Sequence, residues 1–129
     1  MPATGNFLLD KGYDVQAAIV KKRAVKLVGE ELVGPVTAIA DIPIGVAQFD
    51  CTTGEIAKGK GASVRLAGIS VMECSAAIAA GGLVQMASDG RAAPYTGASG
   101  ARLLGLCTKG STTAGQEVSV HLDLPGGVA

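Results

Sequence analysis

The chain has 129 residues, 48% of them hydrophobic, and its eleven Lys and Arg balance its eleven Asp and Glu. This composition excludes intrinsic disorder, which requires few apolar residues and high net charge, and it disfavours nucleic-acid binding, which uses an excess of basic side chains. Nineteen glycines, with only two Phe and two Tyr, predict a core of small aliphatic side chains in a chain of single-domain size.

The N-terminal segment, residues 1–22, carries an apolar triplet and two of the aromatic residues. We expect it to form an arm and a first extended stretch outside the main domain. An apolar arm either folds back on its own domain or docks on another chain, and both alternatives stay open here. If it docks, the predicted partner interface consists of Phe7, Leu8, Leu9 and Tyr13.

The rest of the chain, residues 23–129, consists of short β-branched and aliphatic runs separated by Gly, Asp, Ser and Thr. Such runs predict one all-β domain, a small β-barrel or β-sandwich of short strands. The last run alternates strictly between polar and apolar residues, as in a strand with one buried and one solvated face. The predicted strands are Ala24–Val28, Pro35–Ile39, Ile44–Phe49, Ala62–Leu66, Ile69–Met72, Leu83–Met86, Arg102–Leu106 and Glu117–Leu124.

Three stretches connect or precede these strands. Gly68 separates two of the runs, and we expect a bulge or bend there. Residues 74–80 are rich in Ala and end at Gly81-Gly82, which fits a helical turn or a plain loop equally well. The basic run Lys21-Lys22-Arg23 predicts a solvated strand start, with contact to an acidic partner as the alternative.

The strand pattern is repeated within the domain. Residues 24–68 and 83–124 both show the order strand, turn, strand, loop, Gly-centred strand, loop, strand. The Gly-centred strands contain Gly45 and Gly105. We therefore predict two similar strand units that pack against each other, because one four-stranded unit cannot bury its apolar face alone.

Motifs for catalysis are weak. Residues 54–61 match P-loop spacing up to Lys60, but Gly61 stands where Ser or Thr is required, so we expect a flexible loop between strands. The single histidine, His121, shares a strand face with Ser119 and Asp123. Side chains two apart on a strand lie about 7 Å from each other, too far for a proton relay. We predict no catalytic, cofactor-binding or metal-binding residues, and no enzymatic activity.

The cysteines and the apolar stretches bear on cellular location. Cys51, Cys74 and Cys107 are widely spaced and odd in number, so we expect buried free thiols and synthesis in a reducing compartment. The N-terminus lacks the basic start and long apolar run of a signal peptide. The longest apolar stretch, residues 36–49, is interrupted by an aspartate and a proline, so we expect no membrane-spanning segment.

Three parts of the sequence are rich in Gly, Ala, Val and Ile, and they follow one another in a definite order along the chain. They are Ile42–Gln48 followed by Ser63–Ile69, Ala77–Val84 followed by Ala87–Ala92, and Gly105-Leu106 followed by Ala114–Val118 and the last strand. In this order they resemble the capsid cement proteins of tailed bacteriophages, also called head decoration proteins. The resemblance covers about residues 24–126 and contains no chemical signature.

The resemblance implies a structural protein on the outer capsid surface of the virion, made in the host bacterial cytoplasm. Its implied partners are the major capsid protein and further copies of itself, as a homotrimer at three-fold or quasi-three-fold sites, with no nucleic acid, membrane or cofactor. Two alternatives remain: a phage tail or baseplate subunit, and a small enzyme or ligand-binding β-barrel module. A ligand-binding module predicts a concave pocket with converging polar groups.

Overall fold

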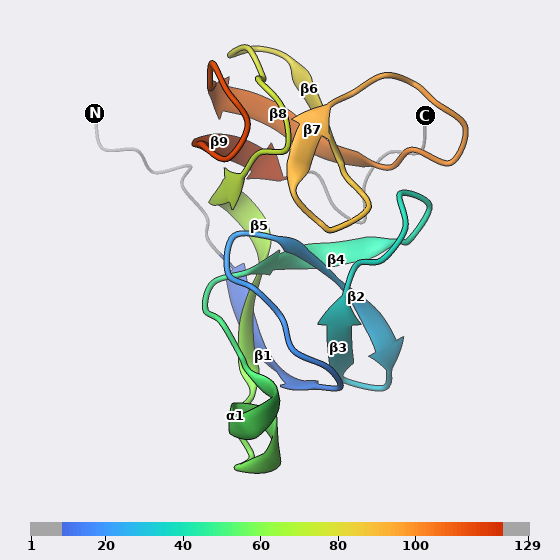
Figure 1. The fold of residues 1–129 in the computed structure, drawn as a ribbon, viewed down its shortest axis with the longest axis vertical. Helices are drawn as coiled ribbons and strands as arrows, with labels where there is room; N and C mark the ends of the chain where they lie inside the picture. The colour runs from blue at the N-terminus through green and yellow to red at the C-terminus, as the bar shows by residue number, and fades with distance from the viewer. Residues whose placement is uncertain (1–8, 123–129) are drawn as a thin grey trace.

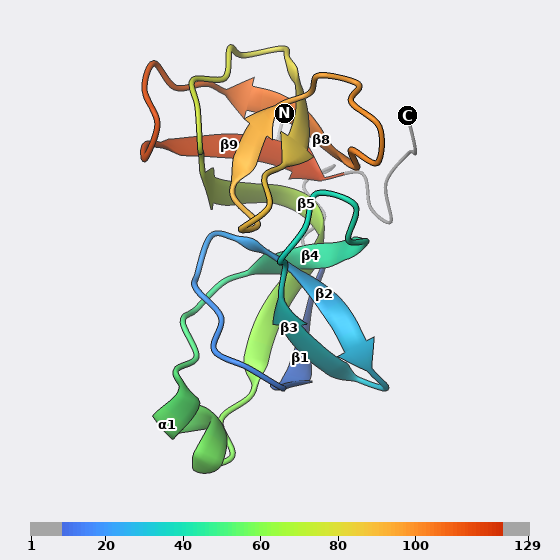
Figure 2. The same ribbon diagram turned by 45° about the vertical axis from the view of Figure 1, so that its right-hand side comes forward.

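The computed structural model describes residues 9–122, which form nine strands and one short helix (Figures 1 and 2). The elements are β1 (Leu9–Val15), β2 (Ala24–Gly29), β3 (Leu32–Pro35), β4 (Pro43–Ala47), α1 (Thr53–Ala57), β5 (Ala62–Glu73), β6 (Leu83–Met86), β7 (Ala92–Pro94), β8 (Leu103–Lys109) and β9 (Glu117–Leu122). The strands follow the order β1-β3-β2-β4-β5-β9-β8-β6-β7, and β1 also pairs with β5. The predicted all-β class of short strands is confirmed.

The first five strands close into a barrel, here called the N-terminal barrel. β1 pairs in parallel with β3, where Val15 lies opposite Val33, and antiparallel with β5, where Tyr13 lies opposite Ala62. A strand bonded on both edges closes the sheet and leaves no open edge. The interior of this barrel contains Val15, Ile19, Val25, Val33, Ala47, Cys51, Ala62 and Val64.

The expected N-terminal arm is divided by this arrangement. Residues 9–15, expected to lie outside the domain, form β1 and belong to the N-terminal barrel. Val15 is buried in the barrel core, and backbone hydrogen bonds to two strands hold β1 in the sheet. Phe7 and Leu8 lie outside the described residues. The sequence showed the apolar residues of this segment but not the strand edges available to it.

β5 is shared between the two halves of the molecule, and Figure 1 shows it running from the lower barrel into the upper one. Its residues 62–67 pair with β1 and β4, and its residues 68–73 pair with β9. Gly68 stands at this change of partner with φ +96°, which L side chains rarely adopt. The expected bend at Gly68 is therefore present within one twelve-residue strand.

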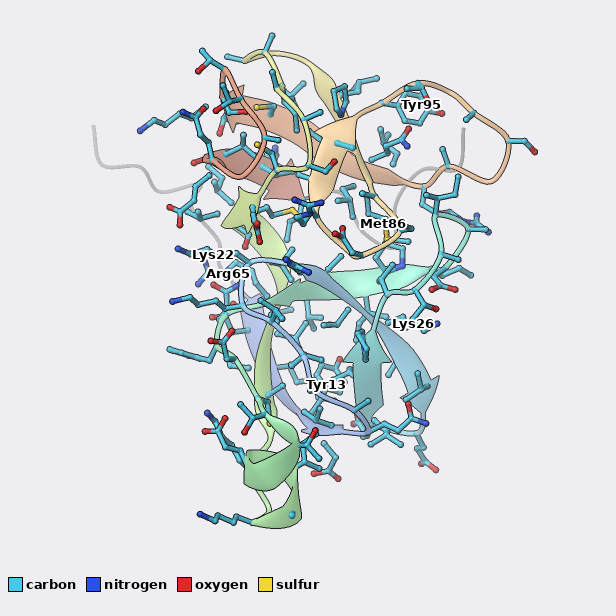
Figure 3. All side chains as sticks on the ribbon, in the orientation of Figure 1. Tyr13, Lys22, Lys26, Arg65, Met86 and Tyr95 are labelled. Carbon is cyan, nitrogen blue, oxygen red and sulfur yellow. The ribbon has the colours of Figure 1, made fainter. Side chains whose placement is uncertain are left out.

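The second half, here called the C-terminal barrel, consists of residues 68–73 of β5 together with β9, β8, β6 and β7. A parallel bridge between Cys74 and Ala92 connects the β5 end to β7, as the Val15–Val33 pair connects β1 to β3. The core is built from Met72, Cys74, Ile78, Val84, Met86, Ala92, Leu104, Cys107, Val118, Val120 and Leu122, joined by Ala24, Val36 and Val46 of the first half. Met86, fully buried, lies where the two barrels meet (Figure 3).

The two barrels repeat one pairing pattern. Val25 lies opposite Gly45 in the β2–β4 pair, and Val84 lies opposite Gly105 in the β6–β8 pair. In both pairs the register shifts directly after the valine, so the bulges also correspond. The order β3-β2-β4-β5 of the first unit is matched by β7-β6-β8-β9 of the second.

The correspondence also includes β1, which is matched by the second half of β5. The N–H of Gln16 donates to the carbonyl of Val33, and the N–H of Ser75 donates to the carbonyl of Ala92, both at 2.8 Å. The segments with these two donors have the related sequences VQAAI and CSAAI. In the structure the first unit therefore begins at β1, earlier than residue 24, where the sequence pattern placed its start.

Two connections differ from the sequence expectations. The strand predicted for Pro35–Ile39 ends at Pro35, because the Asp41 carboxylate accepts hydrogen bonds from the N–H groups of Thr37 (2.9 Å) and Ala38 (3.0 Å) and forms a turn. The Ala-rich residues 74–80, for which a helical turn and a loop were both open, form a loop.

The loop expected at residues 54–61 instead begins with helix α1. Thr52 caps this helix by accepting from the N–H of Glu55 (3.2 Å), while the Glu55 carboxylate accepts from the N–H of Thr52 (3.0 Å). This capping box was readable in the sequence as Thr-x-x-Glu. No helix among residues 9–122 is long and apolar enough to cross a membrane.

Candidate functional site

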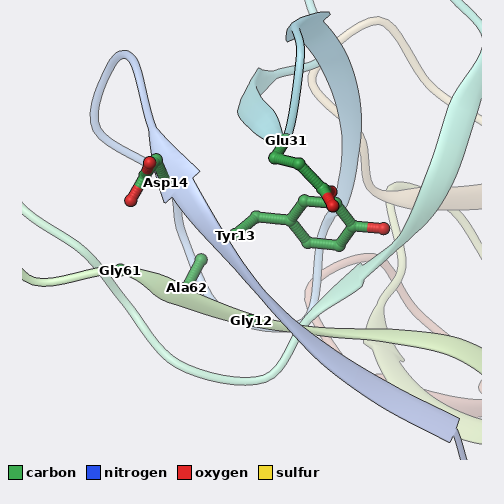
Figure 4. Close-up of a pocket in the computed structure, with 6 residues that line it drawn as sticks. All are labelled: Gly12, Tyr13, Asp14, Glu31, Gly61 and Ala62. Carbon is green, nitrogen blue, oxygen red and sulfur yellow. The ribbon is translucent and has the colours of Figure 1, made fainter.

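A shallow pocket opens at one end of the N-terminal barrel (Figure 4). Tyr13 and Glu31 lie beside each other there, whereas the Asp14 carboxylate points away from both (Figure 4). Glu31 is held by Lys11, whose Nζ lies 2.5 Å from Oε1 of Glu31 and 4.8 Å from the Tyr13 ring centroid. The polar groups of this pocket are paired or diverge, so no observation here favours the ligand-binding alternative.

The three thiols are part of the packed core. Cys51, Cys74 and Cys107 are buried and free, as the sequence predicted. Burial raises the pKa of the Cys107 thiol and so keeps it protonated. Within residues 9–122 no group of three His, Cys, Asp or Glu side chains is placed to hold a metal ion. The thiols therefore act as small apolar side chains.

The basic run of the sequence pairs with acids of the same chain. Lys22 forms an ion pair with Glu117, and the Lys22 ammonium lowers the pKa of that carboxyl. The Arg23 guanidinium lies 3.2 Å from the Glu73 carboxylate. A third cation, Arg91, lies 3.9 Å from Glu73 as well. These pairs link residues 22–23 of the first half to strands of the second, so two of the three cations of the run are paired within the chain.

Four side chains from adjacent strands form a row across the outer face of the C-terminal barrel. Ile69 of β5 lies opposite His121 of β9, His121 lies opposite Leu106 of β8, and Leu106 lies opposite Leu83 of β6. Ile69, Leu106 and Leu83 are 40%, 39% and 49% exposed, and His121 is exposed as well. Because neighbouring strands lie about 4.8 Å apart, the row is about 14 Å long. We call it the outer row.

Part of the equivalent face of the N-terminal barrel is covered, whereas the places of His121 and Ile69 are held there by Arg65, which is half-buried, and Asp10, which is exposed. Ala24 and Val46, which lie opposite each other in the β2–β4 pair, take the places of Leu83 and Leu106. Both are buried, at 1% and 0% exposure, in the core that contains Leu104 of the C-terminal barrel. The C-terminal barrel therefore covers this part of its neighbour's face, while no segment within residues 9–122 covers the outer row.

The residues predicted from the sequence as a partner interface do not form one exposed patch among the described residues. Leu9, at the start of β1, is 54% exposed and lies opposite Ala67. Tyr13 is half-buried and packs against the core of the N-terminal barrel (Figure 3). Sequence reasoning missed the outer row, because apolar residues in a strand look the same whether a neighbour covers them or not. Leu83 and Leu106 were read only as members of strands.

Comparison with known proteins identifies the family. A family model described as phage cement protein matches residues 4–122. Two solved structures share the fold. The head fiber gp8.5 N base of bacteriophage phi29 has TM-score 0.66 and 16% identity, and the match covers 95% of this chain and 99% of that one. A chain from the capsid of Myoviridae phage XM1 has TM-score 0.68 and 15% identity, and the match covers 94% of this chain and 86% of that one. No curated protein matches the sequence. On the family match over most of its length, this chain belongs to the phage cement protein family.

Proposed function

We propose that this capsid cement protein binds the outer surface of the mature phage head and holds neighbouring subunits of the major capsid protein together. The observation that carries the proposal is the match of the cement family model to residues 4–122. The likeness of the fold to a chain in the capsid of phage XM1 supports it. The family match also favours a structural role over an enzymatic one.

The mechanism is a shift of equilibrium. A protein that binds only the expanded lattice stabilises that lattice by mass action, and many identical contacts on one shell increase the effect. The two barrels share β5, and one core cluster contains residues of both, so they can act together in this task. Equal numbers of acidic and basic residues suit dense tiling, because neighbouring copies do not repel one another through net charge.

Self-association and the N-terminal residues complete the proposal. The cement protein would act as a homotrimer at three-fold or quasi-three-fold positions of the head. Phe7, Leu8 and Leu9 would reach a neighbouring subunit. Tyr13 is the weaker member of the predicted interface, since it already packs on its own barrel. Ordering such a segment on docking costs entropy but covers additional surface.

The proposal is tested by sedimentation of the purified full-length chain with expanded and unexpanded heads of its phage that lack this protein. We expect saturable binding to expanded heads, absence of binding to unexpanded heads, and a raised temperature of head disruption once the chain is bound. A chain that stays in the supernatant with both kinds of head would overturn the proposal. Analytical ultracentrifugation of the free chain tests the trimer separately, and a monomer at all concentrations would contradict a preformed trimer.

A further inference from the structure

We propose that the outer row is the docking surface for the capsid, and that its occupant is an uncharged, apolar patch of the major capsid protein. The row consists of Leu83, Leu106, His121 and Ile69, in register across four strands. This inference rests on the proposed function and adds to it the face that makes contact.

The repeat shows how this kind of face is used elsewhere in the same molecule. At the positions of Leu83 and Leu106, the N-terminal barrel has Ala24 and Val46, and both are packed under the C-terminal barrel. The C-terminal barrel keeps apolar residues at these positions, and they are larger, although no part of residues 9–122 covers them. Large apolar side chains aligned on an otherwise solvated sheet face mark a surface that another molecule covers.

The charge distribution selects the chemistry of the occupant. None of the ion pairs among residues 9–122 includes a member of the outer row. The nearest pair borders one end of the row: Arg65 binds Asp10 at 2.8 Å and also donates to the carbonyl oxygen of Ile69 at 3.2 Å, so its charge is paired within the chain. Glu117 pairs with Lys22. Three of the four members of the row are aliphatic, so a complementary surface is apolar and uncharged as well. Binding through such a contact depends little on salt.

The chain ends place the predicted arm next to this surface. The described chain begins at Leu9, opposite Ala67, and ends at Leu122, opposite Gly68. Gly68 and Leu122 are the direct neighbours in sequence of the row members Ile69 and His121. Residues 1–8, which include Phe7 and Leu8, are therefore attached beside the outer row.

Residues 1–8 are also the main competing occupant. When extended they span about 26 Å, which exceeds the length of the row, so they could cover it within the same molecule. A second copy of the chain is the other competitor. The test therefore has to separate an open row that the capsid covers from a row that is already covered in the free protein.

The test is cysteine labelling with a maleimide on the full-length chain. The native thiols are 0% to 1% exposed and Leu106 is 39% exposed, so Leu106→Cys adds a thiol that a maleimide reaches far more easily than the native ones. Ile42→Cys, at a position 56% exposed and outside the row, is the matched control. We expect the Leu106→Cys thiol to react quickly in the free chain and at least tenfold more slowly on expanded heads, while the Ile42→Cys thiol reacts equally in both states.

Binding of serine variants gives an independent readout. We expect the double variant Leu83→Ser, Leu106→Ser to bind expanded heads at least tenfold more weakly than wild type at both low and high salt, with an unchanged melting temperature. Ile42→Ser should bind within twofold of wild type. Should the double variant fail to fold, the labelling of Leu106→Cys alone decides.

Each other outcome has a definite meaning. Slow labelling of Leu106→Cys in the free chain would overturn the inference. If labelling then becomes fast when residues 1–8 are removed, those residues cover the row. If labelling becomes fast on dilution, a second copy of the chain covers it. Fast labelling on heads, or wild-type binding of the double variant, would also overturn it. If wild type itself fails to bind expanded heads, the proposed function fails first.

Discussion

Val46 and Leu106 hold the same position in two copies of one strand pattern, yet Val46 is fully buried and Leu106 is 39% exposed. Each follows the glycine at the centre of its strand, and each lies opposite the corresponding residue of the next strand, Arg65 for Val46 and His121 for Leu106. The difference arises because the second barrel covers Val46, while no segment within the described residues covers Leu106. This asymmetry is what makes the outer row a candidate docking surface.

The central glycines should be essential for the fold. A Cβ at Gly105 would collide with the carbonyl oxygen of His121, and a Cβ at Gly45 would collide with that of Arg65. Gly105→Ala and Gly45→Ala should therefore each lower the free energy of unfolding by about 3 kcal/mol or more, measured by urea denaturation.

The control for the central glycines is Gly54→Ala in α1, where a Cβ meets no atom within 4 Å. Because alanine is the better helix former, this variant should be neutral or more stable by up to about 1 kcal/mol. Equal stability of Gly105→Ala and wild type would mean that β8 and β9 do not approach as closely as described.

Lys22 carries backbone strain that its counterpart in the second unit avoids. Lys22 has φ +65°, and Gly81 has φ +86° in the same hydrogen-bonded position: their N–H groups donate to the carbonyls of Ala47 and Cys107. Lys22→Gly should leave stability within about 1 kcal/mol of wild type, since relief of strain offsets loss of the exposed ion pair to Glu117.

Lys22→Val tests the same point in the opposite direction. A β-branched side chain is strained at positive φ, so this variant should be less stable than Lys22→Gly by about 1 to 2 kcal/mol. Thermal denaturation of both proteins checks the order. If the valine variant is the more stable of the two, the left-handed backbone at residue 22 is not present.

Asp41 should contribute stability that depends on pH. The Lys26 ammonium and the backbone N–H of Thr37 lower the pKa of this carboxyl from 3.8 to about 2. Since the folded pKa lies below the unfolded one, the contribution is present above pH 4 and is lost as the pH falls through about 2. Asp41→Asn should cost about 1 kcal/mol at pH 7, because the pair remains partly solvated.

The measurement for Asp41 is urea denaturation of wild type and Asp41→Asn between pH 7 and pH 2. The two stability curves should approach each other as the pH falls from 4 toward 2. A constant difference between Asp41→Asn and wild type at every pH would contradict the assignment of the lowered pKa.

Deletion of the N-terminal residues should separate binding from folding. Removal of residues 1–8 leaves β1 intact, so the melting temperature should stay unchanged while binding to expanded heads weakens. Removal of residues 1–13 takes away most of β1 and its pairing with β5, so the N-terminal barrel should lose stability. Unaltered capsid binding after removal of residues 1–8 would refute a role of Phe7 and Leu8 as contacts.

Much of this fold was readable from the sequence. The β-branched runs, the bend at Gly68 and the repeated Gly-centred strands follow from local chemistry, because alternation and glycine act within a few residues. The role of β1 was not readable, since pairing with β5 depends on residues about fifty positions away. The capping box of Thr52 and Glu55 is present in the sequence, but the P-loop comparison covered only residues 54–61 and so left out Thr52.

The outer row could not be predicted from the sequence, because its exposure depends on whether another segment packs over that face of the sheet. Leu83 and Leu106 alternate with buried neighbours just as core residues do. Only the register across β6, β8, β9 and β5 shows that they align with His121 and Ile69 on the solvent side. Likewise the arm residues Phe7, Leu8, Leu9 and Tyr13 were chosen by composition, whereas their use as contacts remains a prediction.

The central claim is that this chain cements a phage head from outside through the C-terminal barrel. An electron cryomicroscopy map of expanded heads saturated with the full-length chain tests it most directly. The account predicts two-barrel density on the outer surface that bridges major capsid protein subunits, with Leu83, Leu106, His121 and Ile69 against the capsid. Density at the tail instead of the head, or heads with the outer row facing solvent, would contradict it.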